Sequence, residues 1–190
     1  AEMNEQMPFV YGDNFIHVSK LDCIISSDMK LANINLPTIT DVEKKIGEHC
    51  ASLIEDGYTL QLGIGAIPDA VLMFLDSKKD LGIHTEMFSD GVVDLVNKGV
   101  ITGAKKTLLP GKLVATFLMG TDKLYNFVNK NKDIEMRPVD YVNDPRIIAQ
   151  NDKMISINSC IEVDLMGQVA SETIGLRQFS GTGGQVDYVR

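Results

Sequence analysis

The sequence predicts an α/β fold in which helices flank an open, mostly parallel β-sheet. Two observations predict this class. Short apolar segments alternate with amphipathic ones from residue 38 onward, and the first apolar segment runs through Gly63-Ile64-Gly65 into a helical pattern. Strands that alternate with helices at this spacing are typical of a parallel sheet with helical connections.

The elements can be assigned in order along the chain. Residues 38–57 form the clearest helix, because Thr40 and Glu43 make a capping box and Gly57 ends the helical spacing. Residues 58–62 are predicted as a strand and 68–75 as a helix with Pro68 in its first turn. Further strands are predicted at 82–87, 112–117, 134–139 and 154–157, and further helices at 92–98, 122–128 and 144–150.

Residues 1–37 have a different pattern. The segment FIHVSKLDCII (15–25) is predicted as one or two strands, and NINLP connects it to the first helix, which places a domain boundary near residues 36–39. Residues 1–37 are too few to bury a core alone, so we expect the end of a preceding domain or an edge extension of this one. Because residue 190 directly follows a glycine-rich loop, we expect a fragment of a two-domain protein, with an incomplete domain at 38–190.

The composition and charge disfavour several classes of partner and site. With 44% hydrophobic and 23% charged residues, the chain has the balance of a globular protein, and without a membrane-length apolar run or secretory signal we expect it in the cytoplasm. A formal charge of −8 disfavours nucleic acids and anionic membranes as partners. Cys23, Cys50 and Cys160 lie far apart without CxxC spacing, which predicts free thiols and no metal site.

Three segments could carry chemistry. Gly63-Ile64-Gly65 joins a strand to a helix, where backbone amides can hold an anion, although the same glycines could merely permit a tight turn. It lacks the third glycine of a dinucleotide fingerprint and the Lys-Ser/Thr of a P-loop. Ser180-Gly181-Thr182-Gly183-Gly184 has so little side-chain bulk that a ligand could approach its backbone, but it could also be a flexible loop.

The third segment contains Glu86, within His84-Thr85-Glu86 at the carboxyl end of a predicted strand. Ligands bind at this edge of open α/β sheets, and a carboxylate near amide donors can attack an acyl thioester. The alternative is a solvated glutamate at a loop entrance. Glu162 and Asp164 alternate with apolar residues in IEVDLMGQ, so we assign them to the exposed face of a strand, with a structural role.

Together these stretches resemble the acetyl-CoA hydrolase/transferase family, most closely its 4-hydroxybutyrate and butyrate CoA-transferase members. The resemblance rests on MNEQMPFVYGDNFIHVS, LQLGIGAIPDAV, HTEMFSDGVVDLV, RPVDYVNDPRII, SINSCIEVDLMGQVASE and RQFSGTGGQVDYVR, in that order. It implies two related α/β domains with the active site between them, assembled as a homodimer or larger homo-oligomer. Residues 1–37 would then end the N-terminal domain, and 38–190 would belong to the C-terminal one.

The resemblance also implies the site. The family's nucleophilic glutamate falls on Glu86, and its asparagine near the CoA thioester falls on Asn143. The oxyanion-binding amides fall on Ile64 and Gly184, in loops shaped by Gly63, Gly65, Gly181 and Gly183.

The implied reaction is ping-pong transfer of CoA from an acyl-CoA to a short-chain carboxylate, such as 4-hydroxybutyrate, butyrate or acetate, through a glutamyl-CoA thioester. It needs no metal or redox cofactor, because CoA enters as a substrate. Two alternatives remain: hydrolysis of acyl-CoA by the same glutamate, and a noncatalytic CoA-binding module that uses the glycine loops for contact alone.

Overall fold

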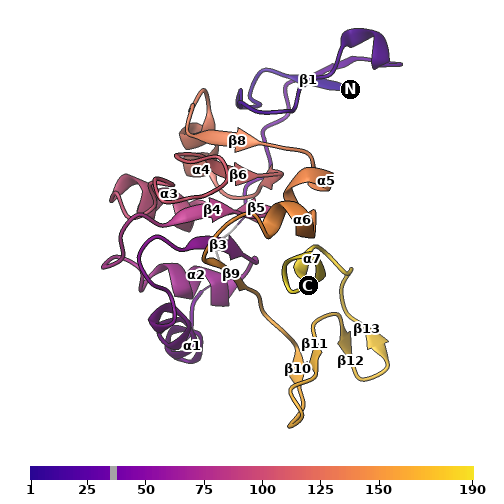
Figure 1. The fold of residues 1–190 in the computed structure, drawn as a ribbon. Helices are drawn as coiled ribbons and strands as arrows, with labels where there is room; N and C mark the ends of the chain where they lie inside the picture. Colours follow the sequence, from indigo (N-terminus) through magenta and orange to yellow (C-terminus); the bar gives the residue numbers. More distant parts are fainter. Residues whose placement is uncertain (35–37) are drawn as a thin grey trace.

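A five-stranded parallel sheet forms the centre of the computed structural model, which describes residues 1–34 and 38–190 (Figure 1). The strand order is β8-β6-β4-β3-β9, and every neighbouring pair is parallel. The strands are β3 (Thr59–Leu62), β4 (Gly82–His84), β6 (Leu113–Ala115), β8 (Ile134–Met136) and β9 (Met154–Ile157). The predicted fold class is therefore confirmed.

The chain order makes β3 the turning point of the sheet. From β3 the chain moves outward through β4, β6 and β8, and it then returns to the other side of β3 as β9. In open α/β sheets, ligands bind beside the carboxyl ends of strands at such a reversal. The edge formed by the ends of β3, β4 and β9 is thus where a site is expected.

Helices cover the central strands, and all four residues of β3 are buried, whereas the edge strand β9 is mostly half-buried. The helices are α1 (Asp41–Ser52), α2 (Ala66–Leu72), α3 (Asp90–Asn97), α4 (Asp122–Val128), α5 (Val139–Val142), α6 (Pro145–Ile148) and α7 (Gln185–Tyr188). The helix α1 begins at the predicted capping box, where Thr40 N–H donates to Glu43 Oε2 over 2.6 Å. It packs closely on α2, since a Cβ at Gly47 would lie 2.7 Å from the backbone of Ala70.

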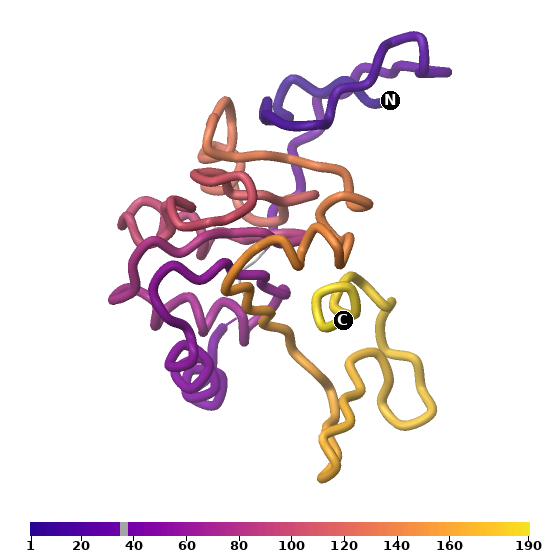
Figure 2. Tube along the Cα trace, viewed as in Figure 1, coloured from indigo at the N-terminus to yellow at the C-terminus, as the bar shows by residue number. Residues whose placement is uncertain are grey.

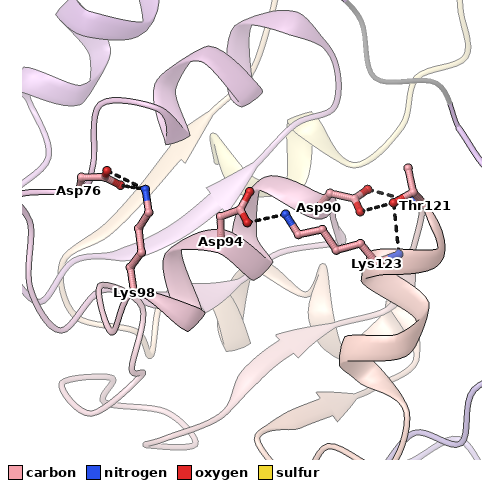
Figure 3. Close-up of polar contacts among 6 residues, drawn as sticks. All are labelled: Asp76, Asp90, Asp94, Lys98, Thr121 and Lys123. Atoms are coloured by element: carbon pink, nitrogen blue, oxygen red, sulfur yellow. Dashed lines mark hydrogen bonds and ion pairs between the residues drawn. The ribbon is translucent and has the colours of Figure 1, made fainter.

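Polar contacts fix α3 against α4 (Figure 3). The buried Asp90 carboxylate accepts hydrogen bonds from the hydroxyl of Thr121, over 2.6 Å, and from its backbone N–H, over 2.9 Å. Lys123 on α4 pairs with Asp94 on α3, on the exposed side of the same contact. Because α3 begins shortly after Glu86, these contacts hold one end of the segment that carries the proposed nucleophile.

Short strands lie outside the central sheet. They pair as β1 (Glu2–Asn4) with β2 (Ile25–Ser27), β5 (Met87–Phe88) with β7 (Phe117–Leu118), β10 (Glu162–Val163) with β11 (Val169–Ala170), and β12 (Thr173–Ile174) with β13 (Arg177–Gln178). Figure 2 shows the N-terminal segment beyond the β8 edge and the two C-terminal hairpins beyond the β9 edge. The N-terminal segment runs parallel to β8 at Gly12, which pairs with Met136.

The structure corrects several predicted elements. The helix predicted at 38–57 spans only Asp41–Ser52, and the strand predicted at 112–117 is interrupted at residue 116. Within 15–25, a 3-10 turn forms at Val18–Lys20, capped by His17 Nδ1, which accepts from Ser19 N–H, and β2 begins only at Ile25. The strand predicted at 82–87 is interrupted at residues 85–86 and resumes as β5. The strand predicted at 134–139 ends at Met136, and α5 begins at residue 139. The predicted boundary at 36–39 falls partly on 35–37, outside the described residues, and stays a prediction.

Candidate active site

A cavity of about 240 Å³ lies at the carboxyl edge of the sheet. Its walls come from the end of β3, the first residues of β5 and β7, the segment after β9, and α7 with the loop before it, so residues far apart in the sequence meet there. Of the predicted site residues, those that line it are Gly63, Ile64, Glu86, Gly183 and Gly184. Gly65 and Gly181, which belong to the same two loops, do not line it, and neither does Asn143.

The Glu86 carboxylate is held by Asn143, whose Nδ2 donates to Glu86 Oε2 over 2.7 Å. Asn143 ends α5 and is 8% exposed, whereas Glu86 is half-buried and faces the cavity. Gly184 lies against both residues. A Cβ placed on Gly184 would be 1.9 Å from Glu86 Oε2 and 2.3 Å from Asn143 Nδ2, so this position has room only for glycine.

Tyr188 on α7 contacts Asn143 and the end of α5. Its hydroxyl lies 3.3 Å from Asn143 Oδ1 and 3.2 Å from the carbonyl oxygen of Val142. Burial, together with the charges of Glu86 and Asp187, raises the pKa of Tyr188, so the phenol stays protonated and acts as a donor. The single hydroxyl proton has two acceptors at nearly equal distances, so Tyr188 packs its phenol against the end of α5 and the amide of Asn143.

The histidine of the HTE motif has a packing role. His84 is completely buried, and its Nε2 donates to the Val142 carbonyl over 2.9 Å. Burial lowers the pKa of His84 to about 4, so the ring is neutral at neutral pH. With the proton on Nε2, Nδ1 has no hydrogen-bond partner among residues 1–34 and 38–190. His84 therefore supports the backbone beside Asn143 and does not line the cavity.

The break between β4 and β5 presents Glu86 to the cavity. On the backbone side, the Glu86 carbonyl accepts from the N–H groups of Thr116 and Phe117, over 2.9 and 3.1 Å. The pairing of β4 with β6 and of β5 with β7 keeps one register across the break. Only the two residues at the break leave the strand geometry, and one of them is Glu86.

The Gly63-Ile64-Gly65 turn follows β3 directly. Gly65 has φ 113° and ψ −174°, a conformation that strains residues with a side chain, and it caps α2. Gly63 N–H donates to the Ile157 carbonyl over 2.8 Å, which ties the turn to β9. Asn158 and Gln61, on the same side of the cavity, bond to each other through their amides, over 2.8 and 3.1 Å.

Several residues of the site were not predicted. Tyr188, Gln61 and Asn158 line the cavity, and Thr85 bonds to the backbone on both sides of it. Tyr188 stands within the GTGGQVDY motif, but its contact to Asn143 spans 45 residues, which no local spacing reveals.

The prediction for residues 162–165 is confirmed for Glu162, which is exposed on β10, but Asp164 lies beyond the end of that strand. Strand β10 has two residues, and Val163 and Leu165 are exposed like their polar neighbours, so this segment has no buried face. Asp164 instead closes the hairpin turn, because its Oδ1 accepts from the N–H groups of Met166 and Gln168, each over 2.8 Å. A two-stranded hairpin outside the main sheet gives apolar residues nothing to pack against.

Two further features bear on function. Within the described ranges, no group of three or more His, Cys, Asp or Glu side chains is arranged to hold a metal ion. In the same part of the chain, no helix has both the length and the apolar character needed to cross a membrane.

Known proteins are similar to this chain in sequence. Residues 120–190 match the family model described as acetyl-CoA hydrolase/transferase C-terminal domain. The whole chain is 64% identical to a 4-hydroxybutyrate coenzyme A transferase of Clostridium kluyveri and 52% identical to a succinyl-CoA:cyclohexane-1-carboxylate CoA transferase of Geobacter metallireducens. In both comparisons it spans 44% of the relative's length.

Solved structures agree with these matches. A 4-hydroxybutyrate CoA-transferase of Porphyromonas gingivalis superimposes with a TM-score of 0.85 at 58% identity, over 88% of this chain and 43% of that one. RipA of Yersinia pestis gives a TM-score of 0.89 at 42% identity, over 99% of this chain and 42% of that one. The chain therefore belongs to the acetyl-CoA hydrolase/transferase family, as its motifs predict.

Proposed function

We propose that this protein transfers CoA from an acyl-CoA to a short-chain carboxylate, with Glu86 as the nucleophile. The observation that supports this most directly is the Glu86 carboxylate at the cavity, bonded to Asn143 and with the Gly184 backbone against it. Carboxylates act as nucleophiles in covalent catalysis, and amide donors near the reacting carbonyl stabilise the oxyanion that forms. Several relatives of this chain are CoA transferases by name, which favours the same reaction here.

In the proposed first half-reaction, a Glu86 oxygen attacks the thioester carbonyl and CoA leaves as a thiolate. This step forms an anhydride between the acyl group and Glu86. The thiolate then attacks the Glu86 carbonyl carbon, which releases the acyl group as a free carboxylate and leaves CoA bound as a thioester.

The second half-reaction reverses these steps with the incoming acid. Its carboxylate attacks the glutamyl thioester, the CoA thiolate leaves and a second anhydride forms. The thiolate attacks the acyl carbon of the incoming group, which regenerates the Glu86 carboxylate. Every bond that breaks is replaced by one of similar kind, so the scheme needs no metal or redox cofactor.

The amides of Ile64 and Gly184 are proposed to stabilise the oxyanions, because both residues line the cavity with Glu86. Asn143 is proposed to position the carboxylate. The relatives' names favour 4-hydroxybutyrate, butyrate or acetate as the accepting acid. The homo-oligomeric state and the cytoplasmic location remain predictions.

The test uses the full-length protein incubated with acetyl-CoA and no accepting acid. CoA should then be found on Glu86 by mass spectrometry, since the ping-pong cycle stops halfway when the second acid is withheld. Adding 4-hydroxybutyrate or butyrate should discharge it. Discharge by water at the same rate would indicate a hydrolase, and no adduct would favour a noncatalytic CoA-binding module.

Replacing Asn143 with alanine should lower the transfer rate by roughly 10–1000-fold, the scale of losing one oriented donor. The amide has no titrating proton and only positions Glu86, so the CoA adduct should still form, more slowly. Steady-state rates and the adduct yield check this. A rate equal to that of the parent would remove Asn143 from the site.

A further inference from the structure

Thr85, the residue before Glu86, has a completely buried side chain whose hydroxyl reaches two separate segments. Leu62 N–H donates to Thr85 Oγ1 over 3.2 Å. The same oxygen lies 2.9 Å from the carbonyl of Met87 and 3.2 Å from that of Leu62. A hydroxyl has one proton to donate, and the shorter distance assigns it to Met87.

These partners are next to the two parts of the proposed site. Leu62 directly precedes the Gly63-Ile64-Gly65 turn, and Met87 directly follows Glu86. The register between β3 and β4 ends at Leu60 and Ile83, so the strand ladder does not extend to the level of the cavity. Beyond that point, the Thr85 hydroxyl makes hydrogen bonds that join the end of β3 to the segment that carries Glu86.

We infer that Thr85 is a positioning residue that sets the distance between the Glu86 carboxylate and the amides of the Gly63-Ile64-Gly65 turn. The inference rests on the proposed function, in which both act on one carbonyl carbon. Its hydroxyl touches neither substrate nor the reacting atoms. It acts by holding Leu62 and Met87, and a misplacement of about 1 Å in such a site can lower a rate by about 100-fold.

The chain offers a matched control at the other end of β3. Thr59 is also completely buried, but its hydroxyl has no hydrogen-bond partner in the described part of the chain. Thr59→Val therefore makes the same change in a buried threonine of β3 without removing a hydrogen bond. Thr85→Val and Thr85→Ala remove the bonding oxygen, while Thr85→Ser keeps it and differs from Thr85→Ala by that oxygen alone.

The experiment measures how fast acetyl-CoA loads CoA onto Glu86 in the full-length protein, together with the KM for acetyl-CoA and the melting temperature. Thr85→Val and Thr85→Ala should load roughly 10–100-fold more slowly than the parent, with KM changed less than about twofold, because the fault lies in alignment and not in binding. Thr85→Ser should recover most of the rate, and Thr59→Val should load like the parent.

Equal loading rates for Thr85→Ser and Thr85→Ala would overturn the inference. So would a failure of both oxygen-free variants to fold, since the hydroxyl would then serve stability alone. If the parent itself takes up no CoA, the proposed function fails and the inference fails with it. A loaded parent with no difference between serine and alanine refutes the role of Thr85 only.

Discussion

Glu86→Gln is expected to lower CoA transfer by about 10³-fold or more while the protein stays folded. Glutamine has the size of glutamate, and its carbonyl oxygen can still accept the bond from Asn143 Nδ2, so the packing of the cavity is kept. It lacks the negative charge that attacks the thioester. Transfer rates and thermal unfolding of the full-length variant check both halves of this expectation.

Glu162→Gln is the control for this change. Glu162 lies exposed on the β10 hairpin, so removing its charge should leave the transfer rate unchanged. Mass spectrometry of a peptide spanning residues 82–98 should show CoA on the parent and none on Glu86→Gln, and borohydride should inactivate only the loaded parent. CoA found on Glu162 or Cys160 would contradict the mechanism, as would parent-like transfer by Glu86→Gln.

Gly184→Ala is expected to lower transfer by at least about 100-fold. The backbone of Gly184 has φ −95° and ψ 2°, which alanine can adopt, so the effect comes from space and not from backbone strain. The added Cβ would lie 1.9 Å from Glu86 Oε2, and either the carboxylate or the loop must move. The rate at which acetyl-CoA loads Glu86 measures that displacement.

Gly181→Ala separates this effect from a general loss of loop flexibility. Gly181 lies in the same loop, and a Cβ there meets no atom within 4 Å. We expect this variant to keep most of its transfer rate and its melting temperature. If both alanine variants load CoA as fast as the parent, the close approach of Gly184 to Glu86 has no catalytic importance.

The sequence predicted the central strands well because each is a short segment between helical patterns. Residues 59–62, which are all buried, and residues 154–157, which are mostly half-buried, are both strands in the structure. Strand interruptions are harder to predict. Ile83, Met87 and Phe88 suggest one continuous strand, and nothing local shows that residues 85–86 leave it. Phe15 and Ile16 were misread because apolar character was taken as strand, although both are exposed.

For the site, the sequence showed which residues stand at strand ends, but it did not show which side chains bond to one another. Glu86 and the GIG turn stand where parallel strands end, so the sequence could place them at one edge. The bond from Asn143 to Glu86 spans 57 residues, and only the family resemblance pointed to Asn143. Thr85 and Tyr188 had no comparable signal, because their roles depend on the backbone and amide groups that the fold brings to them.

Gly184 and Tyr188 lie near residue 190, so the part of the site that they form is synthesised after the central sheet. Translation proceeds from the N-terminus, so all five strands of the main sheet leave the ribosome before residues 182–188 do. Until then Glu86 lacks the Gly184 backbone beside it. A nascent or truncated chain that ends within the hairpins would contain all five strands but lack the residues of one wall of the cavity. Under the proposed mechanism, such a chain would leave cellular acyl-CoA intact.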